Sequence, residues 1–168
     1  MSGAEEADAI ASGLPDLLDT LSSEALNRRP DGRSAGRFLS AEHDGRLWLF
    51  PVNRRGRTVA DLAAHPVAGD TILGGLLRHG VAYWLAHAIR QDLWRALAGR
   101  RGPLPVVAVA LAAGASPRTV LAGALLPPRT RLPMGWQAGA LDRSRLAQHA
   151  AWAKRRDALN RDRGGRGY

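Results

Sequence analysis

Two groups of basic side chains are the residues of this chain best suited to chemistry, because a guanidinium group can hold two oxygens of a phosphate or carboxylate at once. Arg54, Arg55 and Arg57 stand in the segment NRRGR, directly before a predicted helix start. Free backbone N–H groups and the helix dipole favour an anion at such a position. We therefore predict an anion site in this loop, with a solvated basic turn as the alternative.

The second group lies in the segment 141–162, which we predict to be an amphipathic helix with a basic polar side. The cations that we expect to contact an anionic partner are Arg143, Lys154, Arg155, Arg156 and Arg161. The Arg-Gly tail that follows is typical of segments that bind single-stranded nucleic acid through charge and stacking. A solvated helix face with a frayed end is the alternative.

Aromatic residues supply one further candidate contact. Trp136 stands in the irregular segment LPMGW, so we predict that it is an exposed anchor for a partner. Tryptophan and arginine are both enriched at the energetic centres of interfaces. For Trp48 and Trp84 we expect a place in the core.

Signatures of catalysis and of metal binding are missing from the sequence. There is no cysteine, and no G-x-S-x-G or H-E-x-x-H motif occurs. His79 and His87 share a predicted helix face, but eight residues of helix separate them by about 12 Å, too far for one zinc ion. We therefore predict no metal and no cofactor, and we favour a protein that is not an enzyme.

The charge of the chain is divided unevenly along its length. It has 24 Lys and Arg residues, 15 Asp and Glu residues and a net charge of +9. Residues 1–27 contain six of the acids and no cation, which leaves 24 cations, nine acids and a net charge of +15 in 28–168. This pattern indicates an acidic helical arm, 1–27, able to mask a basic body whose partner is nucleic acid or an acidic protein surface.

The excess of arginine over lysine has a second explanation. Lys154 is the only lysine, and Ala, Gly and Leu are abundant, which is typical of GC-rich bacterial coding. Composition bias and selection for an anionic partner both remain open at this point.

The elements that must position these residues begin with a hairpin over 37–51. Asp44-Gly45 between two apolar runs predicts a two-residue turn. In that register Leu39 and Ala41 face Phe50 and Trp48 on one side of the hairpin. Phe38, Leu47 and Leu49 lie on the other side. Both faces are apolar, so we expect a sheet that is covered on both sides.

The remaining elements are expected to be mostly helical. Thr58 and Asp61 predict a capped short helix, and Asp70 or Thr71 is expected to start a long central helix over about 71–98. The segment 104–126 is either a buried strand pair or two helices. The spacing of Ala110, Gly114 and Val120 resembles that of a helix-turn-helix unit, although the positions that would face DNA are apolar.

Together these elements predict an α+β fold: a small antiparallel sheet containing the 37–51 hairpin, packed by the long helix 71–98 and the basic helix 141–162. The predicted domains are the arm 1–27, one basic globular domain over 28–163, and a flexible tail, 164–168. Neither 71–89 nor 103–128 is a clean membrane span, and the acidic start has no basic segment of the kind that begins a secretory signal.

The function that we expect is that of a non-enzymatic cytoplasmic protein that contacts nucleic acid phosphates with low sequence specificity. One alternative is a protein–protein adaptor or subunit of a larger complex. A second alternative is a small enzyme that acts on an anionic substrate.

Overall fold

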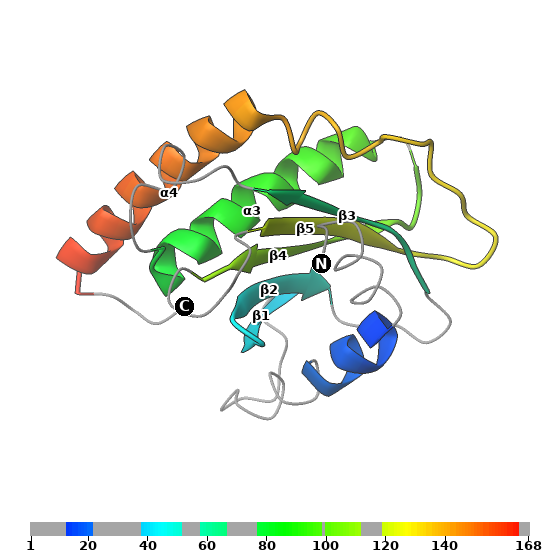
Figure 1. Ribbon diagram of the computed structural model, residues 1–168, viewed down its shortest axis with the longest axis horizontal. Helices are drawn as coiled ribbons and strands as arrows, with labels where there is room; N and C mark the ends of the chain where they lie inside the picture. Colours follow the sequence, from blue (N-terminus) through cyan, green and yellow to red (C-terminus); the bar gives the residue numbers. More distant parts are fainter. Residues whose placement is uncertain are drawn as a thin grey trace.

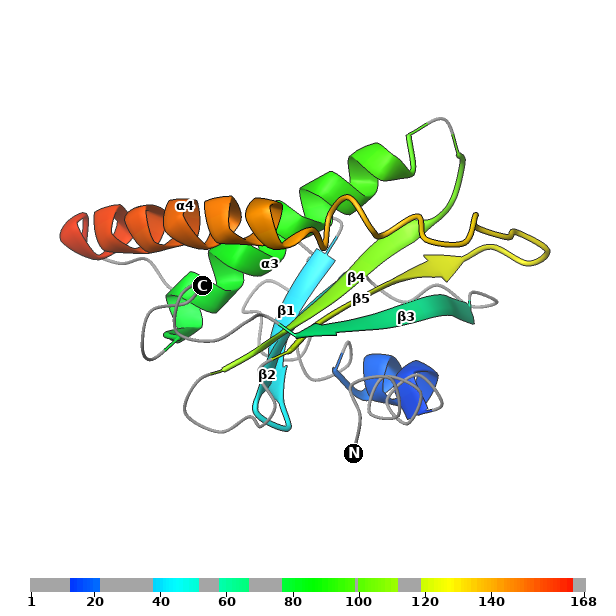
Figure 2. The same ribbon diagram turned by 45° about the horizontal axis from the view of Figure 1, so that its top comes forward.

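The computed structural model describes residues 13–21, 38–51, 58–66, 77–98, 100–111 and 119–164. These residues form a five-stranded antiparallel sheet in the order β1-β2-β4-β5-β3, with helices on both faces (Figure 1, Figure 2). The elements are β1 (Phe38–His43), β2 (Arg46–Pro51), β3 (Thr58–Pro66), α3 (His79–Ala96), β4 (Leu104–Ala110), β5 (Thr119–Leu126) and α4 (Arg143–Asp162). The predicted α+β fold is confirmed.

The hairpin of β1 and β2 forms in the predicted register. Asp44 and Gly45 both have positive φ, 49° and 68°, as the predicted turn requires. Leu39 pairs with Phe50, and Ala41 pairs with Trp48. These four side chains lie in the core on one face of the sheet, whereas Leu47 and Leu49 lie in the core on the other face.

The open question over 104–126 is resolved in favour of a strand pair. β4 and β5 pair antiparallel from Leu104–Leu125 to Val109–Val120. Alternating β-branched residues fit this arrangement, because Val107 and Val109 enter one core while Val106 enters the other. The residues between the strands, 112–118, lie outside the described part. No helix-turn-helix can form, since Ala110 and Val120 are both in strands.

The predicted short helix that begins at Thr58 is wrong, because these residues form β3. β3 pairs with β5 along its length, with a bulge between Ala60 and Ala63. Asp61, expected to cap a helix, sits in this bulge with a positive φ of 26°. The pairing that β5 offers at the edge of the sheet outweighs the local capping pattern.

The long central helix is confirmed, with a later start than predicted. α3 runs over His79–Ala96, and residues 77 and 78 before it are not helical. The predicted start at Asp70 or Thr71 lies outside the described residues. The helix 141–162 is confirmed as α4, whose first turn is capped by Asp142 accepting a hydrogen bond of 3.1 Å from the Arg145 backbone N–H.

Each face of the sheet has its own hydrophobic core. α3 and α4 cover one face, where Leu85, Ile89 and Leu93 of α3 are fully buried. The helical segment 13–21 covers the other face and buries Leu14 and Leu18 against the sheet (Figure 2). The part of the acidic arm that the structure describes therefore lies opposite α4, and it does not mask the cations of that helix.

In the described part of the chain, no helix is both long enough and apolar enough to cross a membrane.

A glycine at the β3 bulge gives a test of this sheet edge. A Cβ atom at Gly123 would lie 2.9 Å from the Asp61 backbone oxygen and 3.1 Å from Leu62 Cδ1. We predict that Gly123→Ala lowers the free energy of unfolding by about 1–3 kcal/mol, because β3 must shift to admit the methyl group. Chemical denaturation measures this loss.

The matched control is Gly139→Ala, where the added methyl group would meet nothing within 4 Å. It should change stability by less than about 0.5 kcal/mol. Equal effects of the two substitutions would contradict the close approach of β3 to β5.

Candidate anion-binding surface

The cations of α4 are spread around the helix instead of forming one face. The side toward α3 is marked by the buried residues Leu146, Ala150, Ala153 and Asp157. At about 100° per residue, Arg143, Lys154 and Arg161 lie on one flank of that side, Arg156 lies on the other flank, and Arg155 points away from α3. All five are exposed, yet they cannot meet one partner surface together.

Two buried acids on the paired helices bind part of this positive charge. Asp92 of α3, whose side chain is 8% exposed, accepts hydrogen bonds from Arg145 Nε at 2.7 Å and Arg145 Nη2 at 3.0 Å. His149 Nε2 lies 2.7 Å from the same carboxylate, and Arg95 Nη1 lies 2.9 Å away. The hydrogen bond from Arg145, assisted by His149, holds the pKa of Asp92 well below its ordinary range, against the opposing effect of burial.

Asp157 of α4 is the second buried acid, with a side chain 3% exposed. Its Oδ2 lies 3.4 Å from Nε of Arg161 and 4.0 Å from Nε of Arg78, which precedes α3. Arg161, predicted to contact an anionic partner, is therefore partly neutralised within the protein. Asp92 links α3 to Arg145 and His149 of α4, and Asp157 links α4 to Arg78 at the start of α3, so both acids help to fix how the two helices lie together.

Cationic and aromatic side chains form a continuous series from α4 across α3 to β1. Trp152 meets Trp84 edge to face with ring centroids 5.9 Å apart, and the Arg156 guanidinium lies 5.1 Å from the centre of the Trp84 ring. His87 stacks on Trp84 at 6.0 Å and meets Phe38 edge to face at 4.8 Å. The series ends at Arg90, whose guanidinium lies 4.4 Å from the centre of the Phe38 ring.

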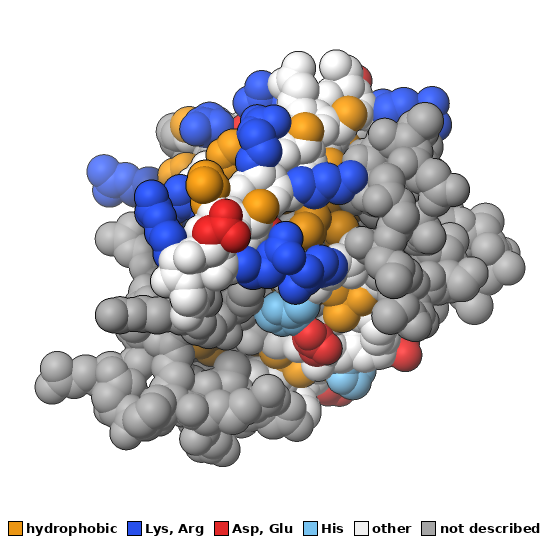
Figure 3. All heavy atoms as spheres, turned by 90° about the vertical axis from the view of Figure 1, so that its left-hand side faces the viewer, with side chains coloured by type: hydrophobic (Ala, Val, Ile, Leu, Met, Phe, Trp, Pro, Cys, Tyr) orange, Lys and Arg blue, Asp and Glu red, His pale blue; other side chains and the backbone are white. Residues whose placement is uncertain are grey.

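We call these residues the Arg–aromatic series: Trp152, Arg156, Trp84, His87, Phe38 and Arg90. Figure 3 shows the side of the molecule on which α4 ends, where Lys and Arg side chains are interspersed with hydrophobic ones. Such a surface offers both charge for phosphates and ring faces for planar groups.

Two titratable members of the series, His87 and Arg90, are half-buried, and burial shifts the pKa of each. Burial, together with the nearby Arg90 charge, lowers the pKa of His87, so this ring is neutral at neutral pH. Burial also lowers the pKa of Arg90, yet a guanidinium remains protonated in proteins. The series therefore keeps its positive charge at Arg90 and Arg156, and His87 acts as an uncharged ring.

A cleft opens beside the Arg90 end of the series, with a volume of about 480 Å³. It lies between α3 and the ends of β1, β2 and β4, and its lining residues are Phe38, Pro51, Arg90, Gln91, Trp94, Arg95, Leu104 and Pro105. Trp94 is 47% exposed there. The cleft therefore combines two guanidinium groups with aromatic and apolar walls.

The other predicted anion site, formed by Arg54, Arg55 and Arg57, lies outside the described residues. Two of the histidines, for which we expect structural roles, contact carboxylates. His79 Nε2 lies 3.2 Å from Glu42 Oε1 of β1, and His149 is held by Asp92. Among the residues that the structure describes, no group of three or more His, Asp or Glu side chains is placed to hold a metal ion.

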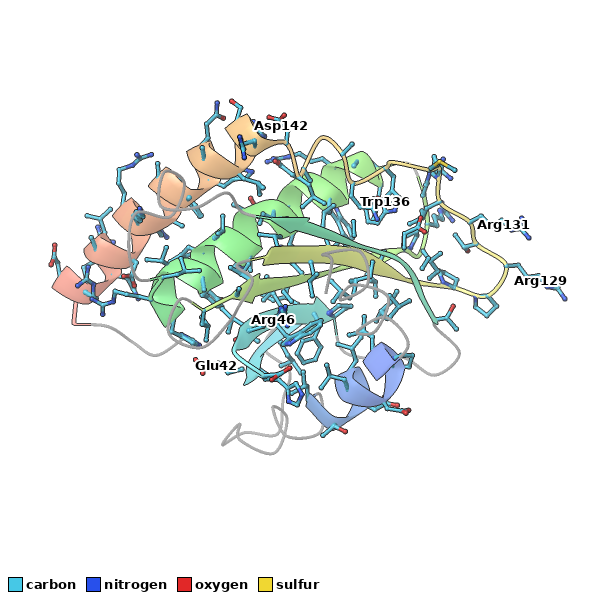
Figure 4. The ribbon with its side chains drawn as sticks, viewed as in Figure 1. Glu42, Arg46, Arg129, Arg131, Trp136 and Asp142 are labelled. Atoms are coloured by element: carbon cyan, nitrogen blue, oxygen red, sulfur yellow. The ribbon has the colours of Figure 1, made fainter. Side chains whose placement is uncertain are left out.

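Trp136, expected to be an exposed anchor, is half-buried and packs against two core clusters, and its contact with a partner stays a prediction. Figure 4 shows it on the connection between β5 and α4, from which Arg129 and Arg131 project away from the sheet. The neighbouring Gln137 donates a hydrogen bond of 3.0 Å from Nε2 to the Asp61 backbone oxygen at the β3 bulge. This bond holds the connection, and with it Trp136, against the sheet.

Several members of the surface were not identified as functional from sequence. Trp84, His87, Gln91 and Trp94 recur at steps of three and four residues in α3. We expected Trp84 in the core, where it is only half-buried, and predicted no function for the other three. The pattern that indicates a surface is the contrast between two sides of α3, one with aliphatic residues and the other with aromatic and polar residues. Leu85, Ile89 and Leu93 mark the buried side.

Comparison with protein-family models, with curated proteins and with solved structures finds no match to this chain.

The Asp92 cluster predicts a pH-dependent contribution to stability. Because the pKa of Asp92 is lowered by folding, its stabilising effect is present above the ordinary carboxyl pKa of about 4 and is lost as the pH falls below that value. Asp92→Asn should lower the free energy of unfolding at pH 7 by about 1–2 kcal/mol, a modest loss because Arg145 is 44% exposed.

Denaturant titrations at several pH values measure this difference. The gap between the native protein and the variant should narrow as the pH falls below about 4. Asp162→Asn, at the exposed last residue of α4, is the control. A gap that stays constant from pH 7 to pH 3 would refute the charge-based role of Asp92.

Proposed function

We propose that this protein binds nucleic acid, with a preference for single strands, through the Arg–aromatic series. The observation that carries the proposal is the unbroken run of ring and guanidinium contacts from Trp152 on α4 to Arg90 beside β1. Arginines contact phosphates without regard to sequence, and exposed rings accept unstacked bases of any kind.

The preference for a single strand follows from the position of the most exposed rings. Trp152 contacts Trp84 within the series and is 38% exposed, and Trp94 lines the cleft beside Arg90. Bases in a duplex are stacked on one another, so their faces are not accessible to these tryptophans. A single strand can place its bases on the rings while its phosphates meet the cations.

Low sequence specificity is part of the proposal. Ring stacking and phosphate contacts carry little information about base identity. We expect affinity to depend steeply on salt and weakly on sequence. A cytoplasmic location, where such a partner is present, is part of the proposal.

Two neighbouring arginines of α4 allow a direct test. Arg156 lies over the Trp84 ring, whereas Arg155 is exposed on the side of α4 that points away from α3. Arg156→Gln should weaken binding of a labelled single strand by about 5–10-fold and reduce the slope of log affinity against log salt by about 0.7. Fluorescence anisotropy at a series of salt concentrations measures both quantities.

Arg155→Gln removes the same charge from the adjacent residue and serves as the matched control. It should change affinity by less than about twofold, because long-range charge effects are weakened by salt. Equal losses in the two variants would contradict a surface centred on Trp84. If the native protein binds no strand even at low salt, the proposed function is refuted and an acidic protein partner becomes the better explanation of the cations.

A further inference from the structure

The cleft beside α3 contains a cation whose charge the described residues do not neutralise. Arg90 is half-buried and lies over the Phe38 ring, and its Nε is buried without a hydrogen-bond partner. No described carboxylate forms an ion pair with it. By contrast, Arg95 and Arg145 are held by Asp92, and Arg161 by Asp157.

An arginine in this state favours an anionic ligand. Burial makes it costly to leave a polar atom of a charged group, here Nε, without a hydrogen bond. A phosphate in the cleft would supply that hydrogen bond and a counter-charge, since a guanidinium binds phosphate oxygens through paired hydrogen bonds. Arg95 lines the same cleft and would add positive charge there. Its partner Asp92 also binds Arg145 and His149, so Asp92 neutralises the charge of Arg95 only in part.

The rest of the cleft fits a planar group joined to that phosphate. Trp94 presents a ring system that is about half exposed, and Gln91 offers an amide that can both donate and accept hydrogen bonds. Leu104 and Pro105 provide an apolar wall at the start of β4. A volume of about 480 Å³ is in the range of pockets for small molecules.

From this combination we infer that the cleft binds a nucleoside phosphate, with the phosphate on Arg90 and the base on Trp94. Two sources can supply this chemistry: a free nucleotide, or one nucleotide of a bound single strand. For a nucleotide within a bound strand, the inference rests on the proposed function, because the strand would reach Arg90 along the Arg–aromatic series. For a free nucleotide it does not.

Titration with adenosine monophosphate, followed through the tryptophan indole N–H signals in NMR spectra, tests the inference. The signal that disappears in Trp94→Phe belongs to Trp94. In the native protein this signal should shift and saturate with adenosine monophosphate. Adenosine alone and inorganic phosphate alone should each bind at least about tenfold more weakly, because each lacks half of the contacts.

Substitutions then separate the two halves of the site. Arg90→Gln should weaken adenosine monophosphate binding by about 10–100-fold and leave adenosine binding unchanged. Trp94→Ala should weaken both ligands by about 5–100-fold. Since Trp94 is 47% exposed, this second variant tests the cleft even if Arg90→Gln does not fold. Arg155→Gln, distant on α4, should leave nucleotide binding unchanged.

The outcomes for the cleft and for the proposed function can be told apart. If the Trp94 signal does not respond to adenosine monophosphate, or if Arg90→Gln binds it normally, the cleft inference is overturned even where strand binding persists. If the nucleotide binds while no strand does, the proposed function fails and the cleft inference stands with a free nucleotide as its ligand. Displacement of the nucleotide by an oligothymidine strand would support the cleft inference with the strand as the source.

Discussion

The burial of α3 between the sheet and α4 is the constraint on which the rest of the structure depends. Leu85, Ile89 and Leu93 are fully excluded from solvent, and each such side chain contributes about 1.5–3 kcal/mol. The sheet packs on one side of α3 and α4 packs on another. The remaining side faces solvent and the edge strand β1. That side carries Trp84, His87, Arg90 and Trp94, so the packing of the core decides which polar and aromatic groups form the surface.

Electrostatics then divides the cations of this basic chain into two classes. Asp92 and Asp157 bind several of them and hold the α3–α4 pair together. Arg90 and Arg156 instead lie over aromatic rings, where no carboxylate forms an ion pair with either among the described residues. Net charge alone therefore overstates the positive surface, and the contacts of each guanidinium show where an anion is favoured.

Local patterns predicted the parts of the fold that depend on neighbouring residues. The Asp44-Gly45 turn fixed the hairpin register, and the cap at Asp142 fits the predicted start of α4 within two residues. β3 was mistaken for a helix because its partner β5 lies about 60 residues further along the chain, and its pairing leaves no local signal. The Arg–aromatic series was missed for the same reason, since it joins Phe38, α3 and Arg156.

The most direct test of the account is to map where a single strand touches the protein. A strand containing 5-bromouracil, irradiated in complex with the native protein, forms covalent bonds to nearby aromatic side chains, and mass spectrometry identifies the modified peptides. Binding through the Arg–aromatic series predicts cross-links at Trp84 in α3 and at Trp152 in α4. Cross-links confined to other segments, with these two tryptophans unmodified, would contradict it.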